Sequence, residues 1–472
     1  ESDARHTEAF TRRFSMRMLL LIILLVGSAP TSNGRSVSPI IAAATVAVTH
    51  VTVVDVTGGP ARHDQTVLID GSRIAAVSPT SRVPIPRGSR IVDGTGKYLI
   101  PGLWDMHTHT VGYGDADAQL ALKLSLAHGV TGLRDMGSHP FGTARALRDS
   151  IAAGRLVGPR MRIAAPVVEN PQWLAAVRGW EEAAGKSTEW MNGRFGPATP
   201  NDARRFVDSA VAIGADHIKV RNWPVADVSN ALIARARERR IPIYAHGNQP
   251  FPRSGMASLE HSIFPRITEG LDSLFRRWAA EGTVMVPTLV ASFARLHPTD
   301  SVIAWINATR FPKLRYAPAK TRLEWRQEIE IAARNEQPFD WRGHYDASLD
   351  DLREMRRAGM RILPGTDFGA PLTIPGVDLH EELAKLVDAL GMSPLEALRA
   401  ATLHPAEFFG IADSLGTIAP GKLADLVLLD ANPLENIRNT RRINAVFANG
   451  RLLDRAALDE LLAEAVQPSR TP

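Results

Sequence analysis

Short apolar runs alternate with stretches of helical pattern through most of this chain of 472 residues, and this alternation limits its fold more than any other feature. Such alternation is typical of repeated strand–helix units that build a parallel sheet. The candidate strands lie at 103–106, 131–134, 160–164, 217–220, 241–245, 258–259, 283–286 and 361–363. Helical patterns lie between them, for example at 201–213, 226–239 and 379–390. Eight strands are the number that a closed parallel barrel requires, so we predict an α/β fold with a TIM-like (β/α)8 barrel.

Strand patterns also mark both ends of the chain. Residues 46–56 are rich in valine and threonine, and Asp70-Gly71 separates two short apolar runs. Asp-Gly tolerates the positive φ angles of a tight hairpin turn, and Asn449-Gly450 gives the same signal near the other end. We therefore predict a small composite β-sandwich domain built from both termini.

These patterns divide the chain into five parts. We assign 1–44 to a signal peptide and linker, 45–98 and 415–455 to the two parts of the β-sandwich, 99–414 to the barrel and 456–472 to a C-terminal tail. Two tryptophan-containing stretches, 169–199 and 291–342, exceed a minimal barrel and follow strands. Both should project over the C-terminal face, where barrel enzymes bind substrate, as lids or substrate walls. Peripheral packing is the alternative.

The first residues have the order of a secretory signal peptide. Arg12, Arg13 and Arg17 precede the apolar run 18–26, and small and polar residues follow it. The run is roughly half the length that a membrane-spanning helix needs. We therefore expect a secreted or periplasmic protein without a stable membrane span after signal cleavage; a retained, membrane-anchored segment is the alternative.

Composition excludes several classes of function. The chain has no cysteine, which excludes disulfides, thiolate metal sites and cysteine nucleophiles, so any metal must be held by nitrogen and oxygen ligands. The net charge is +5, but lysine and arginine are dispersed rather than clustered, so we expect no binding to nucleic acid. The expected partner is a small-molecule substrate, and the sequence leaves open a homo-oligomer.

Two histidines end the first predicted barrel strand. Alternate residues of a strand face the same side, so His107 and His109 should present their imidazoles together. Two neutral imidazoles suit a divalent ion such as zinc. The pair is a weak signal alone, but its position at the carboxyl end of a barrel strand favours a metal site.

Three more polar residues follow predicted strands. Asp367 comes shortly after the last strand, where a carboxylate could bind a metal and accept a proton from water, or simply cap a helix. His246 and His261 follow the runs 241–245 and 258–259. One such histidine is more often structural, whereas two beside the first pair indicate a cluster.

Lys219 lies inside an apolar strand. An unpaired buried ammonium is costly, so this lysine needs a partner or another charge state. A lysine carboxylated by carbon dioxide is an anion that can bridge two metals. A salt bridge to Asp105 or Asp216 is the alternative.

Several of these segments together resemble the amidohydrolase superfamily, and within it the imidazolonepropionase-like and prolidase-like (Xaa-Pro dipeptidase-like) branch. The resemblance covers essentially all of residues 45–455. It rests on the segments PGLWDMHTHT, DHIKV, YAHG, LEHS, PGTDFG and SLGTIAPGKLADLVLLD.

The resemblance implies two divalent metal ions, by default Zn²⁺, although nitrogen and oxygen ligands also accept manganese, cobalt or iron. The implied ligands are His107, His109 and Asp367 for a buried ion, His246 and His261 for a more exposed ion, and carboxylated Lys219 as the bridge. A metal-activated hydroxide would attack a carbonyl carbon, and Asp367 would take its proton and pass it to the leaving nitrogen.

One departure concerns the short interval between His246 and His261, which contains Pro250 and Pro252. A crossover between parallel strands normally needs a dozen or more residues including its helix. The helix after the fifth strand must therefore be very short or absent, which makes His261 the least secure ligand. A site without it would hold one metal.

Five residues are candidate substrate contacts: Arg221, His139, Tyr113, Tyr244 and Arg134. Arg221 lies on the strand face of Lys219, two residues nearer the mouth, and could bind a substrate carboxylate through two parallel hydrogen bonds. A solvent-facing arginine is the alternative.

The resemblance implies hydrolysis of an amide or peptide C–N bond in a small substrate, such as a dipeptide ending in proline or an N-acyl amino acid. Fold alone does not determine the reaction. The alternatives are hydrolysis of a lactam, cyclic imide or lactone at the same site, and a non-catalytic binding protein on the same scaffold.

Overall fold

A computed structural model of the protein describes residues 45–111, 115–137, 139–183, 185, 187–246, 254–261, 270–335 and 340–466. The predicted signal peptide and linker at 1–44 and the candidate substrate contact Tyr113 lie outside the described residues. No helix within the described ranges combines the length and the apolar character that crossing a membrane requires.

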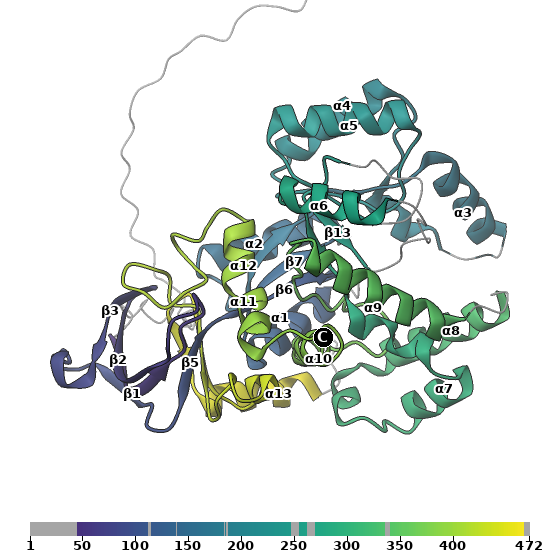
Figure 1. The fold of residues 1–472 in the computed structure, drawn as a ribbon. Helices are drawn as coiled ribbons and strands as arrows, with labels where there is room; N and C mark the ends of the chain where they lie inside the picture. The colour runs from purple at the N-terminus through teal and green to yellow at the C-terminus, as the bar shows by residue number, and fades with distance from the viewer. Residues whose placement is uncertain are drawn as a thin grey trace, which may run out of the picture. The chain divides into compact units, whose positions relative to one another are not determined.

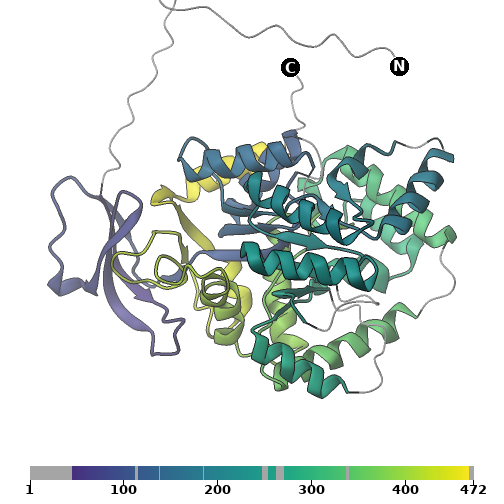
Figure 2. The same cartoon turned by 90° about the horizontal axis from the view of Figure 1, so that it is seen from above.

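Strands from both ends of the chain form one sheet, in the order β17-β16-β15-β5-β1-β2-β3, with β4 also paired to β1. Their bounds are β1 (Val46–Val53), β2 (Arg62–Asp70), β3 (Arg73–Pro79), β4 (Arg90–Asp93), β5 (Tyr98–Pro101), β15 (Leu426–Leu429), β16 (Ile443–Ala448) and β17 (Arg451–Leu453). β5 joins the two ends because it pairs in parallel with β1 and antiparallel with β15. Figures 1 and 2 show the purple strands of the N-terminal part beside the yellow C-terminal part.

The predicted hairpins are present in this sheet. β2 and β3 pair antiparallel across Gly71, and β16 and β17 pair antiparallel across Asn449-Gly450. The two turns meet: a Cβ added at Gly450 would lie 2.0 Å from the carbonyl oxygen of Gly71. Glycine at 450 therefore satisfies both a positive φ of 79° and the close approach of another backbone.

The middle of the chain contributes two parallel sheets, one of three strands and one of six. The first consists of β6 (Leu103–Thr108), β7 (Val130–Asp135) and β8 (Arg160–Ile163). The second consists of β9 (Val167–Val168), β10 (Arg194–Phe195), β11 (Ile218–Val220), β12 (Ile243–His246), β13 (Ser258–Glu260) and β14 (Val284–Val286). Seven of these strands coincide with the predicted ones to within a few residues, whereas the short β9 and β10 were not predicted.

Backbone pairs join these sheets into a closed circuit. Ala164 pairs with His217, which connects β8 to β11, and Met285 pairs with Ile362, which connects β14 to the last predicted strand. The segment 361–368 then returns to β6, where the amide of Asp367 donates to the carbonyl of His107 at 2.8 Å. We call this ring the circuit: it comprises β6, β7, β8, β11, β12, β13, β14 and the segment 361–368.

Helices cover the circuit and alternate with its strands, as Figures 1 and 2 show. They are α1 (Asp115–Ala127), α2 (Phe141–Ala152), α3 (Pro171–Ala183), α4 (Pro200–Ala212), α5 (Ala226–Arg239), α6 (Leu271–Glu281), α7 (Thr299–Asn307), α8 (Ala319–Asn335), α9 (Trp341–Arg357), α10 (Val377–Asp388), α11 (Pro394–Ala401), α12 (Leu403–Phe408) and α13 (Arg455–Val466). The start of α4 is encoded locally, since the side chains of Thr199 and Asp202 form a capping box around Pro200.

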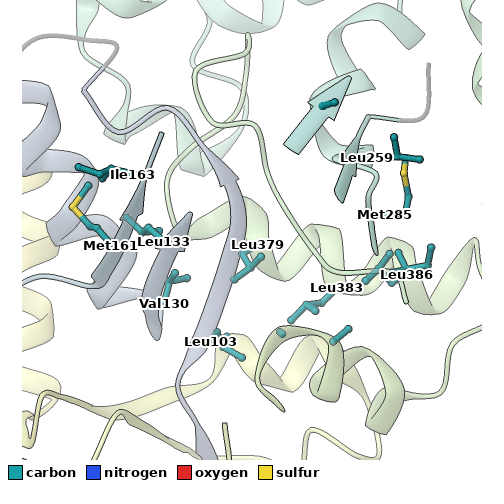
Figure 3. Packing of buried hydrophobic residues seen from close by; sticks show 14 of the residues in the cluster. Leu103, Val130, Leu133, Met161, Ile163, Leu259, Met285, Leu379, Leu383 and Leu386 are labelled. Atoms are coloured by element: carbon teal, nitrogen blue, oxygen red, sulfur yellow. The ribbon is translucent and has the colours of Figure 1, made fainter. Parts of the chain in front are cut away.

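Apolar side chains on the strands pack against α10. Figure 3 labels Leu103 and Val130 of neighbouring strands and Leu379 and Leu383 of this helix among the side chains of one buried cluster. All four are fully buried members of one large apolar cluster. Burying each such side chain contributes roughly 1.5–3 kcal/mol, so this layer holds the strands in place beneath the polar residues at their carboxyl ends.

Gly365 lies where the segment 361–368 passes closest to β6. A Cβ there would lie 2.6 Å from Cγ1 of Val286 and 2.9 Å from the backbone nitrogen of His107. Because these neighbours are a packed side chain and a strand backbone, we expect Gly365→Ala to lower the free energy of unfolding by about 1–3 kcal/mol, measured by urea denaturation.

The matched control is Gly179→Ala in α3, where an added Cβ would meet no atom within 4 Å. We expect this helical substitution to stabilise the protein by about 0.5–1 kcal/mol. Equal stability of the two variants would contradict the close approach at Gly365.

Candidate metal-binding site

Four histidines and one aspartate meet at one end of the circuit. His107, His261 and Asp367 offer ligand atoms that all lie within 4.8 Å of one another. Oδ1 of Asp367 lies 3.4 Å from Nε2 of His107 and 3.2 Å from Nε2 of His109. The ring of His246 lies 4.6 Å from that of His261 between centroids. The structure thus brings together five residues that the sequence pointed to separately.

The elements explain this meeting. His107 lies on β6, His246 ends β12 and His261 follows β13, while Asp367 lies in the segment that pairs with β6. Carboxyl ends of parallel strands share one edge, so their side chains converge although they are far apart in the sequence. No described helix separates β12 from β13, and this short connection nevertheless delivers His261 to the cluster.

Left-handed backbone occurs at three residues of this site. His261 has φ 63°, Thr288 has φ 50° and Asp367 has φ 51°. Such conformations cost about 1–3 kcal/mol each for residues other than glycine, and they concentrate at functional sites. The left-handed backbone at His261 changes the direction of its side chain. In a regular strand Glu260 and His261 would lie on opposite faces, yet here both contact His107.

Hydrogen bonds orient two of the imidazoles. Nδ1 of His109 donates to the carbonyl of Gly137 at 3.2 Å, and Nδ1 of His107 donates to Oε2 of Glu260 at 2.7 Å. Each ring therefore directs Nε2 towards Asp367. Within the described residues, Nε2 of His107 is fully buried and has no hydrogen-bond partner. An unprotonated ring nitrogen held in this way can bind a metal ion.

Burial keeps His107, His246 and His261 neutral. It lowers the pKa of His107 and of His246 well below the ordinary value, and it lowers the pKa of His261 to about 4. For Asp367, burial raises the pKa, but the neighbouring His261 and His109 outweigh it and leave the pKa below its ordinary value. At neutral pH these three residues therefore offer neutral imidazoles, and Asp367 offers a carboxylate.

Lys219 lies beneath this cluster with 2% of its surface exposed. Its Nζ is buried and has no hydrogen-bond partner among the described residues. Burial lowers the pKa of Lys219 to about 7, although the carboxylates of Glu260 and Asp367 raise it. A large fraction of this amine is therefore unprotonated near neutral pH, which is the form that reacts with carbon dioxide.

The salt bridges considered for Lys219 are absent. Asp105 accepts hydrogen bonds from the backbone and hydroxyl of Thr366, and Asp216 pairs with Arg148 and Arg162. The alternative of a salt-bridged lysine at 219 is therefore wrong for these two partners. Nζ of Lys219 and Nε2 of His107 are buried atoms without a hydrogen-bond partner among the described residues. Lys219 lies close enough to His107, His246 and His261 to lower their pKa values, and His107, His261 and Asp367 form a group of nitrogen and oxygen ligands that suits a divalent cation.

A buried ionic network supports His107 from below. Arg134 donates through Nη2 to both oxygens of Glu260 at 2.7 and 2.8 Å, and through Nη1 to the hydroxyl of Ser258 at 2.9 Å. A further bond joins Arg134 to the carbonyl of Met106. Arg134 and Glu260 are both fully buried, so each compensates the other's charge while Glu260 fixes the ring of His107.

This network makes a prediction about stability. Arg134→Met leaves the carboxylate of Glu260 buried without its cation, and we expect it to cost about 3–5 kcal/mol in urea denaturation. The double variant Arg134→Met with Glu260→Gln should cost less than the sum of the two single variants, since both charges are removed together. Strictly additive costs would show that the pair is not coupled.

A cavity of about 500 Å³ opens beside the cluster. His246, His261 and Asp367 line one side of it, and residues of the 291–342 insertion, including Arg295 and Glu328, line another. A different part of the insertion packs around Trp325 in a separate apolar cluster. The insertion therefore forms a wall of this cavity and also contributes peripheral packing.

Two of the predicted substrate contacts are buried. Arg134 is fully buried and has its guanidinium 4.5 Å from the ring centroid of Tyr244. Tyr244 is itself 3% exposed, and it lines a smaller cavity with His217 and Phe408 rather than the one beside the cluster. Neither lines the cavity beside the cluster, and their roles as substrate contacts stay predictions.

Arg221 and His139 lie away from the cavity lining. Arg221 is 3.6 Å from Oε1 of Glu169 and stacks over the ring of Trp173 at 4.8 Å, and His139 packs against Gly193. Their roles as substrate contacts stay predictions.

Sequence reasoning missed Glu260, Arg295 and Glu328. Glu260 could have been found, because a carboxylate inside the apolar run before His261 raises the same question of a partner as Lys219 did. Arg295 and Glu328 gave no signal, since they lie in an insertion without barrel periodicity.

Comparison with known proteins places the chain among relatives. A model of the amidohydrolase family matches residues 98–453, a span that contains the circuit and all six predicted ligands. An imidazolonepropionase from Acidiphilium cryptum is 24% identical over 366 residues, which make up 77% of this chain and 86% of that protein.

Solved structures of other proteins also resemble this chain. A candidate prolidase from Bifidobacterium longum shares 26% identity with a TM-score of 0.67, covering 90% of this chain and 99% of that one. A Xaa-Pro dipeptidase with bound methionine in its active site has a TM-score of 0.65 at 20% identity, covering 87% of this chain and all of that one (100%), and it shares the fold.

Proposed function

Since the chain belongs to the amidohydrolase family and is a hydrolase of that superfamily, we propose that it is a metal-dependent enzyme that cleaves an amide or peptide C–N bond in a small substrate. The observation that carries this proposal is the convergence of four histidines and Asp367 above a buried lysine that lacks a partner among the described residues. The proposed architecture is a TIM-like barrel formed by the circuit, with a small composite β-sandwich built from the sheet of both termini.

We assign the ligands as the resemblance to the amidohydrolase superfamily implies. His107, His109 and Asp367 would hold one ion, and His246 and His261 the other; Oδ1 of Asp367 lies near Nε2 of the first two histidines, and the rings of the other two are neighbours. Lys219, carboxylated by carbon dioxide, would lie between them. When bound, two divalent ions such as zinc would supply Lewis-acid activation of a carbonyl and lower the pKa of water.

Asp367 is the proposed general base and acid. Its low pKa keeps it ionised, and it lies between His107 and His109, facing the cavity. It would accept a proton from the attacking water and deliver it to the leaving nitrogen. Glu260 and Arg134 would hold His107 in the tautomer that leaves Nε2 unprotonated.

The proposed substrates are dipeptides ending in proline or N-acyl amino acids. The likeness to the candidate prolidase supports this class, and the cavity beside the cluster has room for a small molecule. We also propose export to a secreted or periplasmic location, on the basis of the arginines and apolar run at residues 12–26.

The test is metal content per chain beside hydrolysis of a panel containing a prolyl dipeptide, an N-acyl amino acid, a cyclic imide and a lactone. After reconstitution with zinc or manganese and bicarbonate, we expect two ions per chain in the wild type. Asp367→Ala and Lys219→Ala should bind fewer ions and lose at least ~10²-fold in activity, because each removes a ligand and the first also removes the proton carrier.

Asp350→Ala and Lys320→Ala are the matched controls, since their side chains are 72% and 79% exposed. Both should keep the wild-type metal content. A wild-type protein that binds no metal after reconstitution would contradict the proposed mechanism and favour the alternative of a non-catalytic binding protein.

A further inference from the structure

Two opposite charges line the cavity beside the candidate metal ligands. Arg295 belongs to the short helix η3 (Leu289–Leu296), and Glu328 belongs to α8. In the part of the chain that the structure describes, neither makes an ion pair within 4.0 Å or a side-chain hydrogen bond. Two other arginines near the circuit are paired, Arg134 with Glu260 and Arg221 with Glu169.

The electrostatic effects of these side chains show that they share one space with the ligands. Arg295 lowers the pKa of His261 and also that of Glu328. Glu328 and Arg295 are exposed to solvent, yet the surrounding protein atoms and the carboxylate of Asp367 raise the pKa of Glu328. A ligand in contact with Asp367 would therefore lie near both Arg295 and Glu328.

The segment that carries Arg295 is fixed in place. Glu382 accepts hydrogen bonds from the backbone amides of Leu289 and Val290 at 3.0 and 2.9 Å, which caps the start of η3. Just before it, Oγ1 of Thr288 lies 2.7 Å from Nδ1 of His261. The wall of the cavity is thus tied directly to a candidate metal ligand.

The side chain of Arg295 is also supported. Its guanidinium lies 4.8 Å from the ring centroid of Trp341, which lines the same cavity. Stacking of this kind holds the planar group while leaving its N–H donors free at the edge. A guanidinium presented in this way suits a carboxylate, which it binds through two parallel hydrogen bonds.

We propose that Arg295 and Glu328 form a subsite for a zwitterion, in which Arg295 binds the substrate carboxylate and Glu328 its ammonium group. The inference rests on the proposed function and narrows it: of the two classes considered, a dipeptide with both termini free fits this subsite, whereas an N-acyl amino acid lacks the ammonium group. Arg295 thereby takes the role predicted for Arg221, which is paired with Glu169 and lies away from the cavity lining.

The test compares alanyl-proline with its C-terminal amide and with its N-acetyl derivative, using zinc-loaded protein. For alanyl-proline, we expect Arg295→Gln to lower kcat/KM by ~10–100-fold, mainly through KM, because a charge-assisted hydrogen bond is lost. Hydrolysis of the amide should change by less than ~2-fold, since it lacks the carboxylate. Glu328→Gln should impair alanyl-proline and spare the N-acetyl derivative in the same way.

Lys320→Gln and Glu324→Gln are the matched controls on α8, with side chains 79% and 47% exposed. Each makes the same charge change outside the cavity lining, and neither should alter the preference among the three compounds. Melting temperatures of all variants verify that the fold is kept.

Calorimetric binding of the same three compounds separates this inference from the proposed function. A wild type that binds alanyl-proline tightly but hydrolyses none of the panel would defeat the proposed function and leave the subsite supported, provided that Arg295→Gln weakens binding of the dipeptide alone. Equal binding of dipeptide and amide by the wild type, or equal loss of both in Arg295→Gln, would overturn the subsite. Failure of the wild type to bind alanyl-proline would overturn it as well.

Discussion

The hydrogen bonds of Asp105 with Thr366 tie the last segment of the circuit to its first strand. Oδ1 of Asp105 accepts from the amide of Thr366 at 3.0 Å, and Oδ2 accepts from its hydroxyl at 2.6 Å. Burial raises the pKa of Asp105 to about 7, yet the carboxyl group finds a partner for each oxygen. These contacts close the ring, and they place Asp367 against His107 and His109.

The site is built as layers of decreasing burial. Lowest lie Arg134 and Glu260, whose paired charges are fully buried and whose carboxylate fixes the tautomer of His107. Above them Lys219 is held as an amine without a partner among the described residues, and then come the histidines and Asp367. At the top, Arg295 and Glu328 face the cavity. The paired charges of Arg134 and Glu260 orient the ring of His107. The neutral imidazoles and the carboxylate of Asp367 suit a cation.

The sequence predicted the strands well because apolar runs and turn residues are local signals. It pointed to the candidate ligands because each follows or interrupts such a run, as with Lys219 between buried Ile218 and Val220. Depth gave no such signal. Strand alternation reveals which face a residue occupies but not how deeply it is buried, so the burial of Arg134 and Tyr244 could not be predicted.

Other features depend on distant contacts that no local pattern encodes. The left-handed turn at His261 puts two adjacent residues against the same ring of His107. The position of η3 depends on Glu382, 92 and 93 residues further along, so the role of Arg295 could not be predicted from its neighbours. Insertions carry specificity in such folds, and they are the part that periodicity describes least.

The central claim is that one set of residues at the carboxyl ends of the strands holds two metal ions. Anomalous diffraction from crystals grown with zinc and bicarbonate tests it most directly. The account predicts two anomalous peaks, one with Zn–N distances of about 2.0–2.1 Å to His107 and His109 and one at the same distances from His246 and His261, with continuous density from Nζ of Lys219 between them. Zinc peaks only at other residues, with free amine density at Lys219, would contradict it.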